Sequence, residues 1–321
     1  MRVHQTTLRS GITRTKEFER KKLASFAVNV GTKCGHGCLY CSTGSILRMH
    51  RSFAEVGEDP FGTGYAIVDP STPERVEADA RRMRERGMVQ LCTIVDAWSP
   101  EAQEHQLGGR CLEAILSEPG WTVRILTKNA AVRQDFDLIE RYRERVLVGL
   151  SLTATPDKDG VVSVAEPHAS SIAARMSTLR EAVQRGLRTY GMFCPLLPGI
   201  ADSAEQIDEL VGFASSCNVE EVFVEAVNRR GRGPLLCQEA LSLLGHEREA
   251  EAVDRTRRRV HWSQYVADLL RNVQRSMRRH SDMGRLWFLL YPSRLLPEDR
   301  ARIAADDDGV IWLEKTRFLG G

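Results

Sequence analysis

Short apolar runs, each followed by a longer segment with helical spacing, recur along the first two thirds of the chain. The runs predict strands over residues 25–30, 89–95, 121–126, 146–152, 187–193 and 221–227. The segments between and after them predict helices over residues 42–50, 73–86, 100–117, 135–143, 169–185 and 203–215. Repeats of strand and helix indicate a parallel sheet with right-handed crossovers, so we expect an α/β fold.

The pattern differs outside these repeats. Residues 1–24 are polar and basic, which predicts a lead-in with one short strand or turn, and residues 52–72 are rich in Gly, Pro and Asp, which predicts a long loop. Thr72 as N-cap and Gly87 predict the two ends of the helix over residues 73–86. Beyond residue 234 we expect helices over residues 235–250 and 256–279 and short strands over residues 286–291 and 310–313.

The composition is that of an ordinary globular protein. Of the 321 residues, 42% are hydrophobic and 27% are charged. The chain has no long uncharged apolar run and no signal-peptide pattern, so we expect a cytoplasmic protein that does not enter a membrane. Eight cysteines in a chain of this length do not indicate a disulfide scaffold.

Positive charge is clustered although the molecule is nearly neutral. The chain has 45 basic and 43 acidic residues, a net charge of +2. Arginines gather in residues 81–86, 229–232, 255–259 and 275–279. One such run is typical of a solvated helix face, whereas several together leave open a polyanionic partner.

Three cysteines share one short loop. Cys34, Cys38 and Cys41 have C-x3-C-x2-C spacing, with Tyr40 directly before the last cysteine. Three thiolates can hold three irons of a [4Fe-4S] cluster and leave the fourth iron open for a substrate or cofactor, whereas electron-carrying clusters use four cysteines. The alternatives are three structural thiols, or a zinc site whose fourth ligand would be His36 or His50.

Polar side chains also follow three of the predicted strands. Asp96 comes after the strand over residues 89–95, Lys128 after that over residues 121–126, and Ser151 ends that over residues 146–152. In parallel α/β folds the carboxyl ends of strands carry the working residues. An ammonium, a carboxylate and a hydroxyl at one edge of the sheet can together hold a polar ligand, so we predict a binding site there.

The cysteine motif resembles that of the radical SAM superfamily. The resemblance implies a partial (βα)6 barrel and a [4Fe-4S] cluster on Cys34, Cys38 and Cys41. It also implies that S-adenosylmethionine (SAM) binds the open iron and is cleaved to a 5′-deoxyadenosyl radical, with an electron donor of the flavodoxin or ferredoxin type. With this cofactor in view, we predict that the residues that help to bind it are Tyr40, Asp96, Lys128 and Ser151. We therefore expect a lead-in (residues 1–24), a barrel (residues 25–233) and a mostly helical extension packed on it (residues 234–321).

Several segments narrow the resemblance to spore photoproduct lyase and similar DNA-repair proteins. The segments are RILTKN, VLVGLSLT, AEPHASSIAARMSTLREAVQRGL and PLLPGI. They imply that Lys128 and Ser151 hold the cofactor and that Glu166 and Arg175 match further family positions. In spore photoproduct lyase a cysteine in a Cys-Thr-Ser-Asp run returns hydrogen to the product radical. Here Cys92-Thr93 lies in the similar place, but Ile94-Val95 precedes Asp96, so the run is one residue longer.

Cys194 is a second candidate hydrogen donor because it follows the fifth predicted strand, near the expected substrate position. The alternative for both Cys92 and Cys194 is a packed core thiol. The resemblance implies a nucleic-acid lesion as substrate; a peptide, a sugar or a nucleotide metabolite is the alternative with the same chemistry. A second alternative is a non-catalytic protein that binds metal or nucleic acid.

Overall fold

The computed structural model describes residues 1–313 and contains one large, mostly parallel sheet. The nine strands follow the order β12–β11–β10–β9–β8–β7–β6–β3–β2 within the described residues. They are β2 (Thr13–Arg14), β3 (Phe26–Val28), β6 (Met88–Leu91), β7 (Thr122–Thr127), β8 (Val146–Ser151), β9 (Arg188–Leu196), β10 (Val222–Ala226), β11 (Leu286–Leu290) and β12 (Val310–Trp312). All pairs from β3 to β12 are parallel, and β2 pairs antiparallel with β3. The predicted α/β fold with a partial barrel is confirmed, and each of its predicted strands is present.

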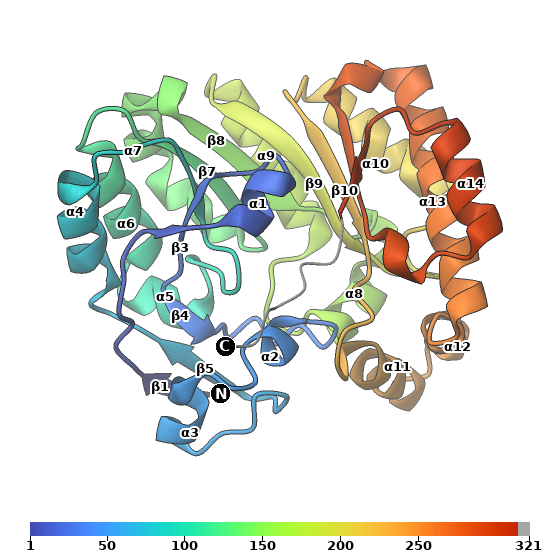
Figure 1. Ribbon diagram of the computed structural model, residues 1–321, viewed down its shortest axis with the longest axis horizontal. Coiled ribbons are helices and arrows are strands. Elements are labelled where there is room, and N and C mark those ends of the chain that lie inside the picture. Colours follow the sequence, from blue (N-terminus) through green and yellow to red (C-terminus); the bar gives the residue numbers. More distant parts are fainter. Residues whose placement is uncertain (314–321) are drawn as a thin grey trace.

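Helices cover the outer face of the curved sheet (Figure 1). The helices of the repeats are α4 (Thr72–Arg82), α5 (Pro100–Glu104), α6 (Leu107–Leu116), α7 (Phe136–Arg141), α8 (Asp159–Ala165), α9 (Ile172–Gln184) and α10 (Ala204–Ser216). Because helices pack on one face and other side chains fill the opposite face, a central strand such as β8 is fully buried, and it is apolar up to its last residue, Ser151.

The concave face of the sheet is covered by the start of the chain. Helix α1 (Lys16–Arg20) lies in front of the sheet, where Phe18 and Leu23 pack against inward-facing residues of the strands (Figure 1). Among the latter are Leu147, Tyr190, Met192, Phe223 and Leu289. The prediction of one short strand or turn in the lead-in was therefore wrong, since it contains β1 (Arg2–Gln5), β2 and α1.

A second, small sheet lies below the first and has the order β1–β5–β4, with β4 at Gly31–Lys33 and β5 at Tyr65–Val68. The prediction of a loop over residues 52–72 was wrong here. The segment contains β5 and most of α3 (Arg51–Val56), which ends at Gly57 with φ +71°. The apolar residues of β5 become a strand because β1 and β4 pair with it from either side, and the sequence pattern does not reveal such partners.

Two predicted helices have different bounds. Helix α4 begins after Ser71 instead of Thr72 and ends at Arg82, because Met83 is extended, well before Gly87. The helix predicted over residues 100–117 is broken at Gln106, whose φ is +54°. The break changes the direction of the chain, so that Gly108 of α6 lies against the Trp98 ring. A Cβ added at Gly108 would approach an atom of this ring within 2.4 Å.

The chain after β10 continues the sheet as well as adding helices. It contains α11 (Gly233–Leu243), α12 (Glu247–Arg255), α13 (Arg259–His280), β11, α14 (Pro297–Ala305) and β12. The helix expected over residues 235–250 is two helices, because Gly245 has φ +81° between α11 and α12. Residues 314–321 of the predicted extension lie outside the described residues. No helix within residues 1–313 has the length and apolarity needed to cross a membrane.

Candidate active site around a three-cysteine loop

The cysteine loop leaves β4 and leads into α2 (Thr43–Ile46). Cys34, Cys38 and Cys41 line one cavity, and all three are free thiols. Gly37, between them, has φ +66°, a left-handed conformation that glycine adopts at no steric cost and that folds the loop back on itself. The predicted clustering of the three thiols is thus seen in space as well as in sequence.

Two of the three thiols have raised pKa values. Burial raises the pKa of Cys34 well above its ordinary value, and the neighbouring thiols of Cys41 and Cys38 add to the rise. Burial and the nearby Glu166 raise the pKa of Cys38 to about 12. Such thiols are protonated at neutral pH unless bound metal ions stabilise their thiolates.

His36 does not supply a fourth ligand. Its side chain is buried, with 1% of its surface exposed, and both ring nitrogens have protein partners. Nδ1 lies 3.1 Å from the carbonyl oxygen of His168, and Nε2 lies 3.0 Å from a carboxylate oxygen of Asp96. Among residues 1–313 no group of three or more His, Cys, Asp and Glu side chains has the geometry of a single-metal site. A cluster differs from a single ion in that each cysteine binds a different iron.

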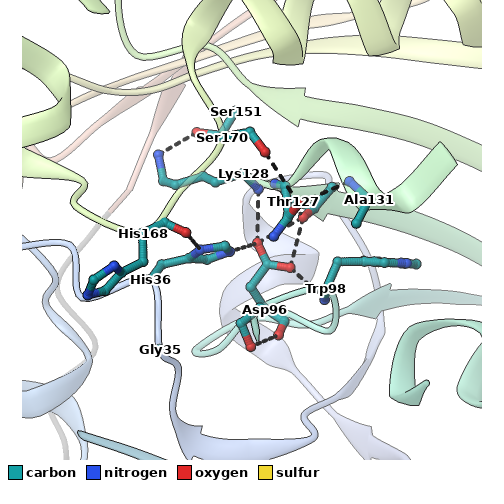
Figure 2. A network of polar contacts seen from close by, with 12 residues as sticks. Gly35, His36, Asp96, Trp98, Thr127, Lys128, Ala131, Ser151, His168 and Ser170 are labelled. Atoms are coloured by element: carbon teal, nitrogen blue, oxygen red, sulfur yellow. Dashed lines mark hydrogen bonds and ion pairs between the residues drawn. The ribbon is translucent and has the colours of Figure 1, made fainter. Parts of the chain in front are cut away.

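Asp96 joins the cysteine loop to the ends of two strands (Figure 2). Besides His36, its carboxylate accepts hydrogen bonds from the Thr127 hydroxyl and from the backbone N–H groups of Lys128 and Trp98, at 2.8–2.9 Å. Burial opposes ionisation of Asp96, but His36 and the N–H donors outweigh it and lower the pKa. Asp96 is buried, and both of its oxygens bind protein donors, so the residue orients His36 and the start of the loop after β7.

A second buried network surrounds Glu166, which follows α8. Its carboxylate accepts from Lys128 Nζ at 3.1 Å and from the Thr153 hydroxyl at 2.8 Å, and also from Tyr40 and Arg175. Burial acts to raise the pKa of Glu166, but Lys128 and Arg175 hold it well below its ordinary value. Tyr40 from the cysteine loop is thereby linked to Lys128 from the end of β7.

Lys128 and Ser151 meet at the carboxyl edge of the sheet, as predicted from their positions after neighbouring strands. Lys128 Nζ lies 2.9 Å from Ser151 Oγ and 3.4 Å from the carbonyl oxygen of Cys194, which also accepts from Ser151 (Figure 2). Three donor hydrogens of the ammonium therefore fix its place between Glu166, Ser151 and β9.

Sequence reasoning missed one carboxylate of the site. Glu101, in the first turn of α5, accepts from the Gly35 N–H at 3.0 Å and from the Ser99 hydroxyl at 2.6 Å. It fixes the start of the cysteine loop. The available signal was an acidic residue directly after Ser99-Pro100, a helix start that follows the Asp96 strand end.

The two candidate hydrogen donors lie in different surroundings. Cys92 is buried in the main core, where burial raises the pKa of its thiol well above the ordinary value. Cys194 is partly exposed and packs against the side chains of the concave face. Its Sγ lies 3.8 Å from Glu225 Oε2, and Glu225 forms a 3.2 Å ion pair with Lys21 from the lead-in.

The fold resembles solved structures of spore photoproduct lyase. The chain matches "Spore photoproduct lyase complexed with dinucleoside spore photoproduct" with a TM-score of 0.58 and 13% identity, over 87% of this chain and 79% of that chain. A single-residue mutant of the same enzyme gives a TM-score of 0.60 and 14% identity, over 87% and 78%. At this identity the likeness concerns the fold.

Relatives in sequence are uncharacterized proteins. One from Acidianus two-tailed virus is 26% identical over 212 residues, which is 64% of this chain and 68% of that protein. One from Mycobacterium tuberculosis is 24% identical over 215 residues, which is 66% of this chain and 62% of that protein. The match thus covers less than two thirds of the mycobacterial protein.

The model of the radical SAM superfamily matches residues 28–213, which is more than half of the chain and spans the cysteine loop and the ends of β6 to β9. This family uses a [4Fe-4S] cluster and SAM. Three free thiols that line one cavity, with no fourth protein ligand among residues 1–313, fit that cluster. The chain therefore belongs to the radical SAM superfamily and is an enzyme of that class.

Proposed function

We propose that the protein abstracts a hydrogen atom from a substrate bound at the concave side of the sheet, and that Cys34, Cys38 and Cys41 ligate its cluster. The observation that carries the proposal is the set of three free thiols on one cavity, beside the Lys128 ammonium and the Ser151 hydroxyl. When bound, the cluster and SAM supply a 5′-deoxyadenosyl radical. The electron would come from a flavodoxin or ferredoxin-type donor.

The chain's own residues would orient the cofactor. Lys128 can place its positive charge beside the carboxylate of the methionine end, because Glu166 and Ser151 already fix the position of its ammonium group. Tyr40 tethers the cysteine loop to Glu166, and Asp96 holds His36 and the Lys128 backbone. We therefore infer that Lys128 and Ser151 lie beside the cofactor, while Tyr40 and Asp96 act through the residues that they position.

Cys194 is the better candidate for returning hydrogen to the product radical. It is partly exposed on the concave side, whereas Cys92 is enclosed in the core. In this step the Cys194 S–H bond breaks, a C–H bond forms on the product, and a thiyl radical remains. An electron from the same donor and a proton then restore the thiol.

The substrate proposed first is a lesion in nucleic acid. The support is the likeness to spore photoproduct lyase, solved with a dinucleoside photoproduct, together with the arginine clusters. The longer Cys-Thr-Ile-Val-Asp run and the enclosed Cys92 argue against an unchanged lyase reaction. These two differences favour a second candidate function, in which the same hydrogen abstraction takes place on a peptide, sugar or nucleotide metabolite.

Anaerobic reconstitution tests the chemistry. We expect a brown protein with about four irons per chain, and 5′-deoxyadenosine after dithionite and SAM are added. Alanine in place of Cys34, Cys38 or Cys41 should abolish both, whereas Cys217→Ala, which removes an isolated buried thiol, should leave both unchanged. A wild-type protein that binds no iron, or that yields no 5′-deoxyadenosine when loaded, would refute the proposal.

Separate alanine variants test the hydrogen donor once a substrate is known. In deuterated water, Cys194→Ala should lose deuterium incorporation into the product, and Cys92→Ala should retain it. The opposite result would assign the step to Cys92.

A further inference from the structure

A cavity distinct from that of the cysteines lies beside the carboxyl ends of β10 and β11. It is lined by the segment from Glu225 to Arg230, by residues after β11 and by two residues of α13, and it shares no lining residue with the cysteine cavity. Its volume is about 60 Å³, several times the roughly 10–15 Å³ that one water molecule needs. A small polar group of a few atoms can therefore enter it.

Three arginines line this cavity without a carboxylate partner among residues 1–313. They are Arg229, Arg230 and Arg294. Many other arginines of the chain form ion pairs, such as Arg188 with Glu220 at 2.7 Å. Burial lowers the pKa of Arg229, and the nearby Arg294 and Arg257 lower it further, because like charges are held together. An arginine remains charged at neutral pH, so the cluster favours an anion.

Among residues 1–313, Glu225 is the acidic residue on the cavity wall, and it does not cancel this charge. Glu225 is paired with Lys21 at 3.2 Å, and its carboxylate also lies 3.8 Å from the Cys194 thiol. Tyr291 lines the same wall. The cavity is thus next to the concave side of the sheet, with Glu225 as the shared residue.

Trp262 supplies an independent observation. This lining residue is 5% exposed, and its indole N–H has no hydrogen-bond partner among the described residues. The indole N–H groups of the other four tryptophans, Trp98, Trp121, Trp287 and Trp312, all donate to an oxygen. A buried N–H group without an acceptor is costly, and an anion in the cavity offers one.

We propose that this cavity binds a phosphate ester of the substrate, with Arg229, Arg230 and Arg294 as the cationic groups and Trp262 as a neutral donor. The fork of an arginine fits phosphate oxygens, and several arginines can share one phosphate. The link to the radical reaction rests on the proposed function, since the substrate carbon must reach Cys194, whose Sγ lies 3.8 Å from Glu225 on the cavity wall. The phosphate can belong to a nucleic-acid strand or to a single nucleotide.

Binding measurements without reductant test the site. The probes are thymidine 5′-monophosphate and a short fluorescein-labelled single-stranded oligothymidylate. Arg229→Gln and Arg294→Gln should each weaken binding about tenfold, as expected for a hydrogen bond to a charged group. The matched control is Arg141→Gln, which removes an exposed arginine at the end of α7. Arg141 precedes the amino end of β8, whereas the cavity lies beside the carboxyl ends of β10 and β11.

Two further measurements separate a binding role from a structural one. Trp262→Phe keeps the ring and removes the N–H, so it should weaken phosphate binding severalfold while the circular dichroism spectrum stays that of the wild type. For the oligonucleotide, loss of one arginine should reduce the slope of log affinity against log salt by about 0.7.

The two probes distinguish the source of the phosphate. Binding of the oligonucleotide that depends on Arg229 and Arg294 supports a strand, and equally dependent binding of the mononucleotide alone supports a small substrate. Failure of both probes to bind, or equal binding by the cavity variants and Arg141→Gln, would overturn the proposal. Because no turnover is measured, these results stand apart from any failure to form 5′-deoxyadenosine.

Discussion

Glu166, like Asp96, is a buried carboxylate beside the cysteine loop that accepts several hydrogen bonds. It accepts from Tyr40, Lys128, Thr153 and Arg175, and it is buried. Both Glu166 and Arg175 are almost fully enclosed, so neither charge can be solvated by water if the other is removed. The pair therefore fixes the position of the Lys128 ammonium at the edge of the sheet.

We predict that Glu166→Gln destabilises the cluster-free protein at pH 7 by about 3–5 kcal/mol, because it leaves a buried guanidinium without its counter-charge. Urea unfolding measures the change. Glu113→Gln, an exposed position on α6, serves as control and should stay within about 0.5 kcal/mol of the wild type.

We also predict that the loss of unfolding free energy in Glu166→Gln depends on pH. The folded pKa of Glu166 lies below the unfolded value of about 4.3, so its stabilisation is complete above that pH and is lost as the pH falls. The difference in unfolding free energy between wild type and Glu166→Gln should therefore shrink on acidification below about pH 4.3, by at most about 1.4 kcal/mol per pH unit. A difference that grows as the pH falls would contradict this assignment.

At the scale of elements, the start of α11 packs directly on the cysteine loop. A Cβ on Gly233 would lie 2.7 Å from the carbonyl oxygen of Tyr40, and Gly233 lines the cysteine cavity. Helix α11 can approach the loop this closely only with glycine at that position.

We predict that Gly233→Ala moves α11 or the loop and reduces iron bound after reconstitution to less than about half of the wild-type amount, since a site of this kind depends on loop geometry. Iron content and the visible absorption of the cluster are the measurements. Gly160→Ala is the control: a Cβ there meets open space in α8, so normal iron content is expected, with a gain in helix stability of about 0.5–1 kcal/mol. Equal iron content in both variants would argue against the steric role of Gly233.

At the scale of the whole molecule, the sheet does not stop at the last predicted barrel strand. Strand β11 pairs in parallel with β10 over Val222 to Glu225, and β12 pairs with β11. The main apolar core contains residues from Ile12 to Ile303. The part after residue 233 thus shares both sheet and core with the part before it.

We predict that a chain ending at residue 233 does not accumulate as folded protein. Truncation would turn the wholly buried β10 into an exposed edge and remove α13, which packs against α10. Soluble yield and circular dichroism, compared with the full chain, measure the effect. A soluble fragment with a cooperative unfolding transition would show that residues 25–233 form an independent unit.

The repeats, the cysteine loop and the strand-end positions of Lys128 and Ser151 could all be predicted from sequence, because alternation of apolar runs and short-range spacing are local properties. The predicted bounds of elements were wrong where tertiary structure decides them. β5 is a strand because β1 and β4 pair with it, and the helix predicted over residues 100–117 is broken at Gln106, so that Gly108 packs against Trp98. The sequence did not reveal that the Asp96 carboxylate is bonded to His36, Thr127 and backbone N–H groups, and contact of Asp96 with the cofactor stays a prediction. The position of a residue at a strand end does not show which groups its side chain will bind.

By itself, the sequence determined the class of fold and the chemistry: parallel strands with helices between them, and three thiols close enough to share a cluster. The tertiary structure decided which groups surround that loop and how they are charged. Glu101 meets Gly35 across 66 residues, Tyr40 meets Glu166 across 126, and Lys21 meets Glu225 across 204. The reason is physical: spacing along a chain governs contacts within one helix or loop, whereas contacts between distant segments form only when the sheet closes and its core excludes water.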